Sequence, residues 1–253
     1  MNSVVSSLKL LPIDLIDLHE DYEPSRLIKT IANIENDQFL RHPILVTRLA
    51  NDRYLVLDGV HRFMSLKKLG YTKVPVQEVT KNEFTFTVWH HLVKSGNWYK
   101  ELLHNPNLPW VKDKKEGSLF IEMITNKNDR HFLYKDDIAP HFLESWHTVV
   151  SSYTKHHDVT RIPQESDFSP QAEEVLIIYG ALDYDLIAQY VMDGNKLPAG
   201  VTRFQVNGRL LNLQAPLALL QESSQFEAEW AELLRKSEQS LRCYVEKVYL
   251  CER

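Results

Sequence analysis

Hydrophobic and polar positions in the first 80 residues follow two alternating spacings, that of β-strands and that of amphipathic helices. Strands or extended segments, rich in aliphatic side chains and bounded by polar turns, are predicted at residues 8–18, 42–49, 54–59 and 74–79. Helical spacing covers residues 26–39 and 60–69, with Ser25 as the expected N-cap of the first helix and Gly70 ending the second. Short strands that alternate with helices predict an α/β unit for residues 1–80.

The pattern changes after residue 80, where aromatic residues cluster over 84–91 and 96–110. Strand-like segments are expected at 118–124, at 131–137, within 198–220 around a turn at 206–208, and at 242–250. Helical spacing is expected at 137–152, 181–192 and 223–241. This mixture predicts a second, mixed α+β domain over residues 81–253, with the boundary near residue 80.

Bulk composition is that of an ordinary globular protein. The chain has 253 residues, of which 43% are hydrophobic and 25% charged, enough to form a sizeable core. No apolar run approaches the roughly 18 residues that span a bilayer, and the N-terminus lacks the features of a signal peptide. We therefore expect a cytoplasmic protein without a membrane partner. Cys243 and Cys251 lack the spacing of a zinc site and are expected to be passive thiols.

Charge bears on nucleic-acid binding. The formal net charge is −5 and the pI is about 6.1, whereas duplex-DNA-binding domains usually carry a basic stripe. This excess of acidic residues argues against DNA as the main ligand, although the local basic stretch 112–115 keeps DNA as a possible partner. The histidine pairs at 90–91 and 156–157 suggest a metal or haem, but neither has the i, i+4 spacing on a helix nor a neighbouring thiolate.

The candidate chemistry begins where the strand 54–57 ends. Asp58, Gly59, Val60, His61 and Arg62 follow at once. A helix that starts at Gly59 or Val60 presents unpaired N–H groups and the positive end of its dipole, and glycine allows an anion to approach the backbone. His61 and Arg62 add side-chain donors. The alternative is an ordinary helix-start ion pair between Asp58 and Arg62, with His61 incidental.

A carboxylate beside a phosphate site needs a second explanation, because the two negative charges repel each other. Asp58 suggests either a magnesium–phosphate site or a carboxylate that handles a substrate hydroxyl. Glu20, in the acidic stretch 20–23, is a second candidate acid that reaches the strand end, unless this stretch is only a solvated loop.

These motifs occur in an order that resembles the ParB/sulfiredoxin family. The resemblance covers about the first 80 residues: an extended lead, a helix, two strands, the Asp-Gly turn with His-Arg, a helix and a Val-Pro strand. Sulfiredoxins have their catalytic cysteine where this chain has Val60, and partitioning proteins continue into a helix-turn-helix that is not evident here. The remaining branch is the free-serine kinases. The whole chain is similar to the free-serine kinases that are encoded with staphyloferrin B siderophore biosynthesis.

The resemblance implies an ATP- and Mg²⁺-dependent enzyme that converts L-serine to O-phospho-L-serine, for 2,3-diaminopropionate and siderophore synthesis. Glu20 corresponds to the essential glutamate of these kinases, and residues 58–62 correspond to the nucleotide and catalytic loop, in which Gly59, Val60, His61 and Arg62 hold the nucleotide. Trp98, Thr202 and Arg203 correspond to the serine pocket.

Several alternatives stay open at this point. Glu20 is favoured as the base that takes the hydroxyl proton, with Asp58 as orienter, but the two roles are interchangeable on sequence grounds. ATP and ADP are both acceptable donors, and a homodimer is neither supported nor excluded. The competing hypothesis is a ParB-like, nucleotide-responsive regulator that binds DNA or a haem effector.

Overall fold

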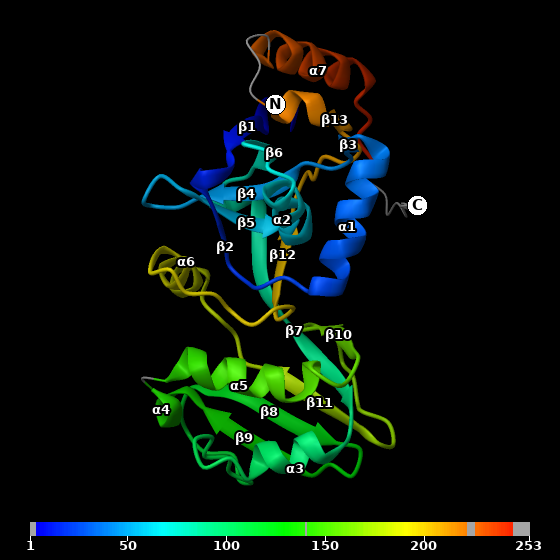
Figure 1. Ribbon diagram of the computed structural model, residues 1–253. Coiled ribbons are helices and arrows are strands. Elements are labelled where there is room, and N and C mark those ends of the chain that lie inside the picture. The colour runs from blue at the N-terminus through cyan, green and yellow to red at the C-terminus, as the bar shows by residue number, and fades with distance from the viewer. Residues whose placement is uncertain (1–3, 140, 222–225, 245–253) are drawn as a thin grey trace.

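Two β-sheets organise the chain, one in the upper and one in the lower part of Figure 1. The computed structural model describes residues 4–139, 141–221 and 226–244. The first sheet has the order β1-β6-β4-β5-β2. Its strands are β1 (Leu8–Pro12), β2 (Ile16–Leu18), β4 (Ile44–Arg48), β5 (Tyr54–Asp58) and β6 (Lys73–Glu78). β2 is parallel to β5 and β4 is parallel to β6, while the pairs β4–β5 and β1–β6 are antiparallel.

Both faces of the first sheet are covered, which explains why its central strands are apolar throughout. One face packs against helices α1 (Pro24–Asp37) and α2 (Val60–Lys68) through Val46 and Val56. The other face packs, through Leu45 and Leu55, against α6 (Tyr184–Met192), a helix from the later half of the chain. The α/β pattern predicted for residues 1–80 is confirmed in these elements.

The second sheet is antiparallel and has the order β10-β7-β11-β8-β9, with β12 paired to the first half of β7. Its strands are β7 (Phe84–Lys94), β8 (Leu119–Thr125), β9 (Arg130–Tyr134), β10 (Val159–Pro163), β11 (Glu174–Tyr179) and β12 (Thr202–Val206). Helices α3 (Asn97–Leu103), α4 (Lys135–Ile138) and α5 (Phe142–Thr154) contribute to its core. The long strand β7 runs from the region of the first sheet into the second (Figure 1).

The last part of the described chain returns to the first sheet. Two-residue strands β13 (Ala215–Pro216) and β3 (Phe39–Leu40) pair there, and a 3₁₀ turn at Leu217–Leu220 joins the core under α1 and α2. Helix α7 (Phe226–Ser240) follows, and its Trp230 and Leu233 pack on the same core. The core around the first sheet is therefore built from both ends of the chain, although its five strands all lie within residues 8–78. A domain boundary near residue 80 stays a prediction.

Some local predictions need correction. Glu23, not Ser25, occupies the N-cap position of α1, without a capping hydrogen bond from its side chain. Pro24 is the first helical residue, where a backbone N–H would have no partner within the helix. Strand β7 is absent from the sequence predictions. Its residues 90–93 are buried on both faces of the strand, so the alternation of hydrophobic and polar residues that marks a half-exposed strand is missing. Of the predicted strand at 242–250, residues 242–244 have no regular structure and the rest lies outside the described residues.

Two further observations concern cysteine and membranes. Cys243 is an exposed free thiol, and Cys251 lies outside the described residues. No helix in the described ranges combines the length and the apolar character needed to cross a bilayer.

Candidate functional site

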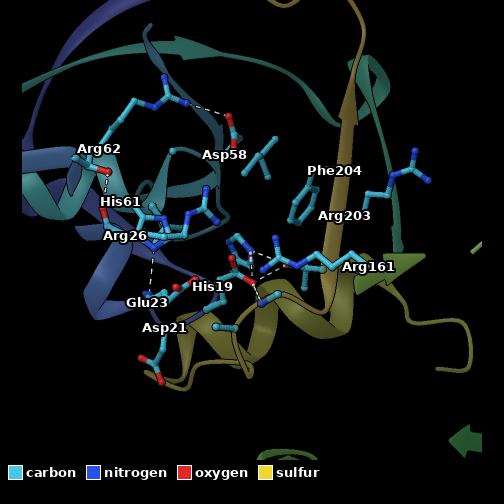
Figure 2. Close-up of a pocket in the computed structure, with 18 of the residues that line it drawn as sticks. His19, Asp21, Glu23, Arg26, Asp58, His61, Arg62, Arg161, Arg203 and Phe204 are labelled. Carbon is cyan, nitrogen blue, oxygen red and sulfur yellow. Dashed lines mark hydrogen bonds and ion pairs between the residues drawn. The ribbon is translucent and has the colours of Figure 1, made fainter. Parts of the chain in front are cut away.

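A large cleft is lined by residues from both sheets. It has a volume of about 1340 Å³, more than the ~300–1,000 Å³ usual for one small ligand. The first sheet contributes the loop after β2, the start of α1 and the β5–α2 junction; the second contributes parts of β7, β10 and β12. Figure 2 shows these side chains converging on a common space. The cleft has room for two substrates.

Glu20 projects into this cleft from the loop after β2. Its backbone bridges to Leu197, and its Oε2 atom accepts hydrogen bonds from the Gly200 N–H at 2.8 Å and from Thr202 Oγ1 at 3.2 Å. The neighbouring His19 is buried; its Nδ1 donates to Val56 O at 2.6 Å, and its Nε2 lies 2.8 Å from the same Thr202 hydroxyl. Glu20 is therefore fixed to a segment almost two hundred residues away in sequence.

Asp58 terminates β5 and is ion-paired on two sides. Its Oδ2 accepts from Arg62 Nη2 at 2.9 Å and also from Arg209 Nη2. Burial alone would raise the pKa of this carboxyl, but the two guanidinium charges and the Gly59 N–H outweigh it and hold the pKa below its usual value. Asp58 is thus ionised at neutral pH. A carboxylate of lowered basicity is a poor acceptor of a substrate proton.

Helix α2 begins at Val60 and has no side-chain cap. Gly59 is its N-cap residue, with φ at 101°, a left-handed conformation that disfavours residues with a Cβ. The Val60 side chain is buried in the core, so that this residue offers the cleft only its backbone. The start of α2 therefore retains the anion-binding character predicted from the sequence.

His61 and Arg62 differ from their expected roles as cationic donors. The Glu23 N–H donates to His61 Nε2 at 3.1 Å, and burial together with the Arg26 charge lowers the His61 pKa. The ring is therefore neutral and keeps its proton on Nδ1. Arg62 Nη1 donates to the carbonyls of His42 and Pro43, at 2.8 and 2.9 Å, so its guanidinium braces the junction.

The three residues expected to bind serine are placed differently from one another. Thr202 lines the cleft beside Glu20. Arg203 also lines it, but its Nη1 binds Glu165 at 2.6 and 2.8 Å, and its guanidinium lies over Trp89. Trp98 belongs to the core of the second sheet, with its indole N–H bonded to Lys94 O, and does not line the cleft.

Several residues of the cleft were not predicted from the sequence. Arg26 and Arg161 both line it, and within the described parts of the chain neither guanidinium has a hydrogen bond or ion pair. Arg26 lies in the first turn of α1, near His61 in Figure 2, and Arg161 lies in β10. Neither belongs to a motif, so no signal in a single sequence singles them out.

A series of buried hydrogen bonds, through His91, Tyr153 and Tyr179, connects the Gly200 segment to the core of the second sheet. His91 Nε2 lies 2.9 Å from Gly200 O, an atom that only accepts, so Nε2 carries the proton. His91 Nδ1 then accepts from the Tyr153 hydroxyl at 2.7 Å, which in turn is 2.6 Å from the Tyr179 hydroxyl. Gly200 thus links these buried side chains to the cleft: its carbonyl accepts from His91, and its N–H donates to Glu20.

We expect His91 to make folding stability depend on pH. Burial, then the nearby charges of Arg161 and His90, lowers its pKa to about 4, against about 6.5 in an unfolded chain. The unfolded state therefore binds more protons between these values, and the free energy of unfolding falls as pH drops from about 6.5 to 4, by roughly 3 kcal/mol. Urea unfolding across this range measures it.

The matched variant for this prediction is His91→Gln, which keeps a donor and an acceptor but does not titrate. His61, His90 and His131 also have lowered pKa values and contribute to the total slope. The informative quantity is therefore the difference between variant and native protein. Parallel stability curves for the two would contradict the assignment to His91.

Comparisons with known proteins identify relatives along the whole chain. The ATP-dependent L-serine kinase SbnI of Staphylococcus aureus is 43% identical over 254 residues, covering 100% of both chains. A solved structure of SbnI with a C-terminal truncation is 42% identical with a TM-score of 0.88, and the match covers 94% of this chain and 100% of that one.

A more distant solved structure shares the fold. A free serine kinase in complex with AMP has a TM-score of 0.67 at 16% identity, covering 85% of this chain and 93% of that one. No family model matches the sequence. The identity to SbnI over the full length nevertheless decides the relationship. This chain belongs to the family of ATP-dependent L-serine kinases.

Proposed function

We propose that this protein transfers the γ-phosphate of ATP to the hydroxyl of free L-serine, giving O-phospho-L-serine and ADP. The observation that carries the proposal is that one cleft contains both a held carboxylate, Glu20, and a helix start suited to phosphates, at Val60. The family relationship supports the same reaction. Supply of phosphoserine for 2,3-diaminopropionate and siderophore synthesis is part of the proposal.

Glu20 is the general base in this reaction. As the serine oxygen forms its bond to the γ-phosphorus, the hydroxyl proton passes to Glu20, and the bond from that phosphorus to the β–γ bridging oxygen breaks. Among the described residues, Glu20 accepts the Gly200 N–H and shares the Thr202 hydroxyl with His19. Asp58 is poorly suited to this role, because the charges of two arginines hold its pKa below the usual value.

The start of α2 holds the phosphates. The backbone N–H groups of Val60 and His61, the proton on His61 Nδ1 and the guanidinium of Arg26 stabilise the negative charge that develops in the transition state, and Gly59 lets the phosphates approach the backbone. Arg62 acts by bracing Asp58 and the 42–43 backbone.

Magnesium fits this site only together with the nucleotide. The described residues contain no group of three or more His, Cys, Asp or Glu side chains arranged for a metal. Mg²⁺ commonly binds through one or two carboxylates and substrate phosphates, a role open to Asp58. When bound there, it neutralises phosphate charge.

The proposal assigns the two sheets different substrates. The first, with α1 and α2, is a ParB/sulfiredoxin-like nucleotide-binding domain over residues 1–80. Residues 81–253 supply the serine pocket, even though their last described part packs on the first sheet.

The direct test mixes the protein with Mg²⁺, ATP and L-serine and follows both products. We expect one ADP for each O-phosphoserine by mass spectrometry. L-Alanine, which lacks only the hydroxyl, gives neither product and competes with serine. ADP release that does not depend on serine, or a complete absence of phosphoserine, would refute the proposal. Replacing ATP by ADP in the same assay determines the donor.

A further inference from the structure

The position of Arg161 assigns it a function that no motif predicts. We propose that Arg161 binds the α-carboxylate of the amino-acid substrate and so selects free amino acids over serine within peptides. The inference rests on the proposed function. Three observations support it: the ion-pairing state of each arginine in the cleft, the contact of Arg161 with the Gly200 peptide that binds Glu20, and the shape of serine.

Arg161 is one of two arginines in the cleft whose charge is uncommitted within the described residues. Arg62 and Arg209 are bound to Asp58, Arg203 is bound to Glu165, and Arg41 is bound to Asp37. Arg26 and Arg161 have no such partner. A guanidinium fork matches the two oxygens of a carboxylate. The Arg203 side chain, expected from the sequence to bind serine, has its Nη1 donors on Glu165 instead.

The Arg161 guanidinium lies directly against the peptide that holds the base. A Cβ placed on Gly200 would come within 2.5 Å of Arg161 Nη2 and 3.1 Å of its Cζ. The Gly200 N–H donates to Glu20 Oε2 at 2.8 Å. Glycine at this position, with φ at 83°, therefore both makes the turn and leaves the space that the guanidinium occupies.

The size of serine decides which of the two arginines can bind its carboxylate. The carboxylate of serine is only two carbon–carbon bonds from the carbon that carries the hydroxyl, so its partner must lie beside the base. Arg161 meets this requirement through its contact with Gly200, whereas Arg26 lies next to His61 in Figure 2, toward the start of α2. Arg161 therefore fits the carboxylate and Arg26 the nucleotide.

The test compares L-serine with L-serinamide, in which a neutral amide replaces the carboxylate. For Arg161→Gln we expect kcat/KM with L-serine to fall about 100-fold, the scale of a lost charge-assisted fork. With L-serinamide, variant and native enzyme should be equally slow, and KM for ATP should not change. Arg161→Lys, which keeps the charge without the fork, should be intermediate.

Controls make each outcome decisive. Because Arg161 is exposed, the Arg161→Gln variant should have the same melting temperature as the native protein, which a thermal unfolding curve measures. Arg203→Gln should keep the native preference for serine over serinamide. An Arg161→Gln enzyme that keeps this preference, or that loses affinity for ATP instead, overturns the assignment. If the native enzyme forms no phosphoserine, the proposed function itself fails; if it does and only the preference test fails, the fault lies with Arg161.

Discussion

Replacing Glu20 with glutamine should abolish most phosphoserine formation while leaving the protein folded. The amide oxygen of glutamine can still accept the Gly200 N–H, which now anchors Glu20 at 2.8 Å, but it cannot take a proton. Loss of a general base typically costs about 10²–10⁴-fold in rate. Single-turnover formation of O-phosphoserine measures this loss, and calorimetric titration with ADP should give an unchanged affinity.

A neighbouring acid provides the control for Glu20. Asp21 is exposed and forms an ion pair with Lys196 at 3.2 Å, so Asp21→Asn should turn over at nearly the native rate. Phosphoserine formation by Glu20→Gln within a few-fold of native would remove Glu20 from the role of base. A loss accompanied by a lower melting temperature would indicate that Glu20 matters for the Gly200 segment alone.

Replacing Asp58 with asparagine should separate catalysis from nucleotide binding. The carboxylate is ionised, because the charges of Arg62 and Arg209 hold its pKa below the usual value. Its removal takes a negative charge from beside the phosphate site and releases donors on both arginines. We expect kcat to fall by on the order of 100-fold, whereas the affinity for ADP should stay the same or rise. Steady-state kinetics and ADP titration measure the two effects.

A similar ion pair elsewhere supplies the comparison for Asp58. Asp52 and Arg48 form an i, i+4 pair on the surface, at 2.8 Å, just as Asp58 and Arg62 do at 2.9 Å in the cleft. Asp52→Asn should change neither kcat nor ADP affinity, since exposed pairs contribute little. If Asp58→Asn weakens ADP binding and leaves kcat intact, Asp58 serves only to shape the junction between β5 and α2.

The elements of residues 1–80 could be predicted because each depends on local sequence. The run 54–57 is apolar and ends at an acid and a glycine, and a strand that stops before a helix follows from those neighbours. The same locality identified Asp58, Gly59 and the helix start as a candidate anion site. Strand β7 escaped prediction because burial on both faces removes the periodicity on which such predictions depend.

The partners of each charged side chain could not be predicted, because they come from distant segments. Arg62 and Arg203 were both assigned to substrates, and in the structure both bind the protein itself, at Asp58 and Glu165. Whether an arginine is available for a ligand depends on which acids the fold brings near it. Spacing along the chain carries no such information.

By itself, the sequence determined the strand–helix units of the first sheet, the helix start that suits phosphates and the two acids that suit phosphoryl transfer. These follow from backbone preferences and side-chain chemistry acting over a few residues. Only the tertiary structure decided that Glu20 accepts hydrogen bonds from Gly200 and Thr202. It also decided that His91 binds the Gly200 carbonyl from the core and that Arg161 lines the same cleft as Glu20. The physical reason is that contacts between residues more than a hundred positions apart are fixed by how the sheets pack, and the favourable energy of that packing is spread over the whole core.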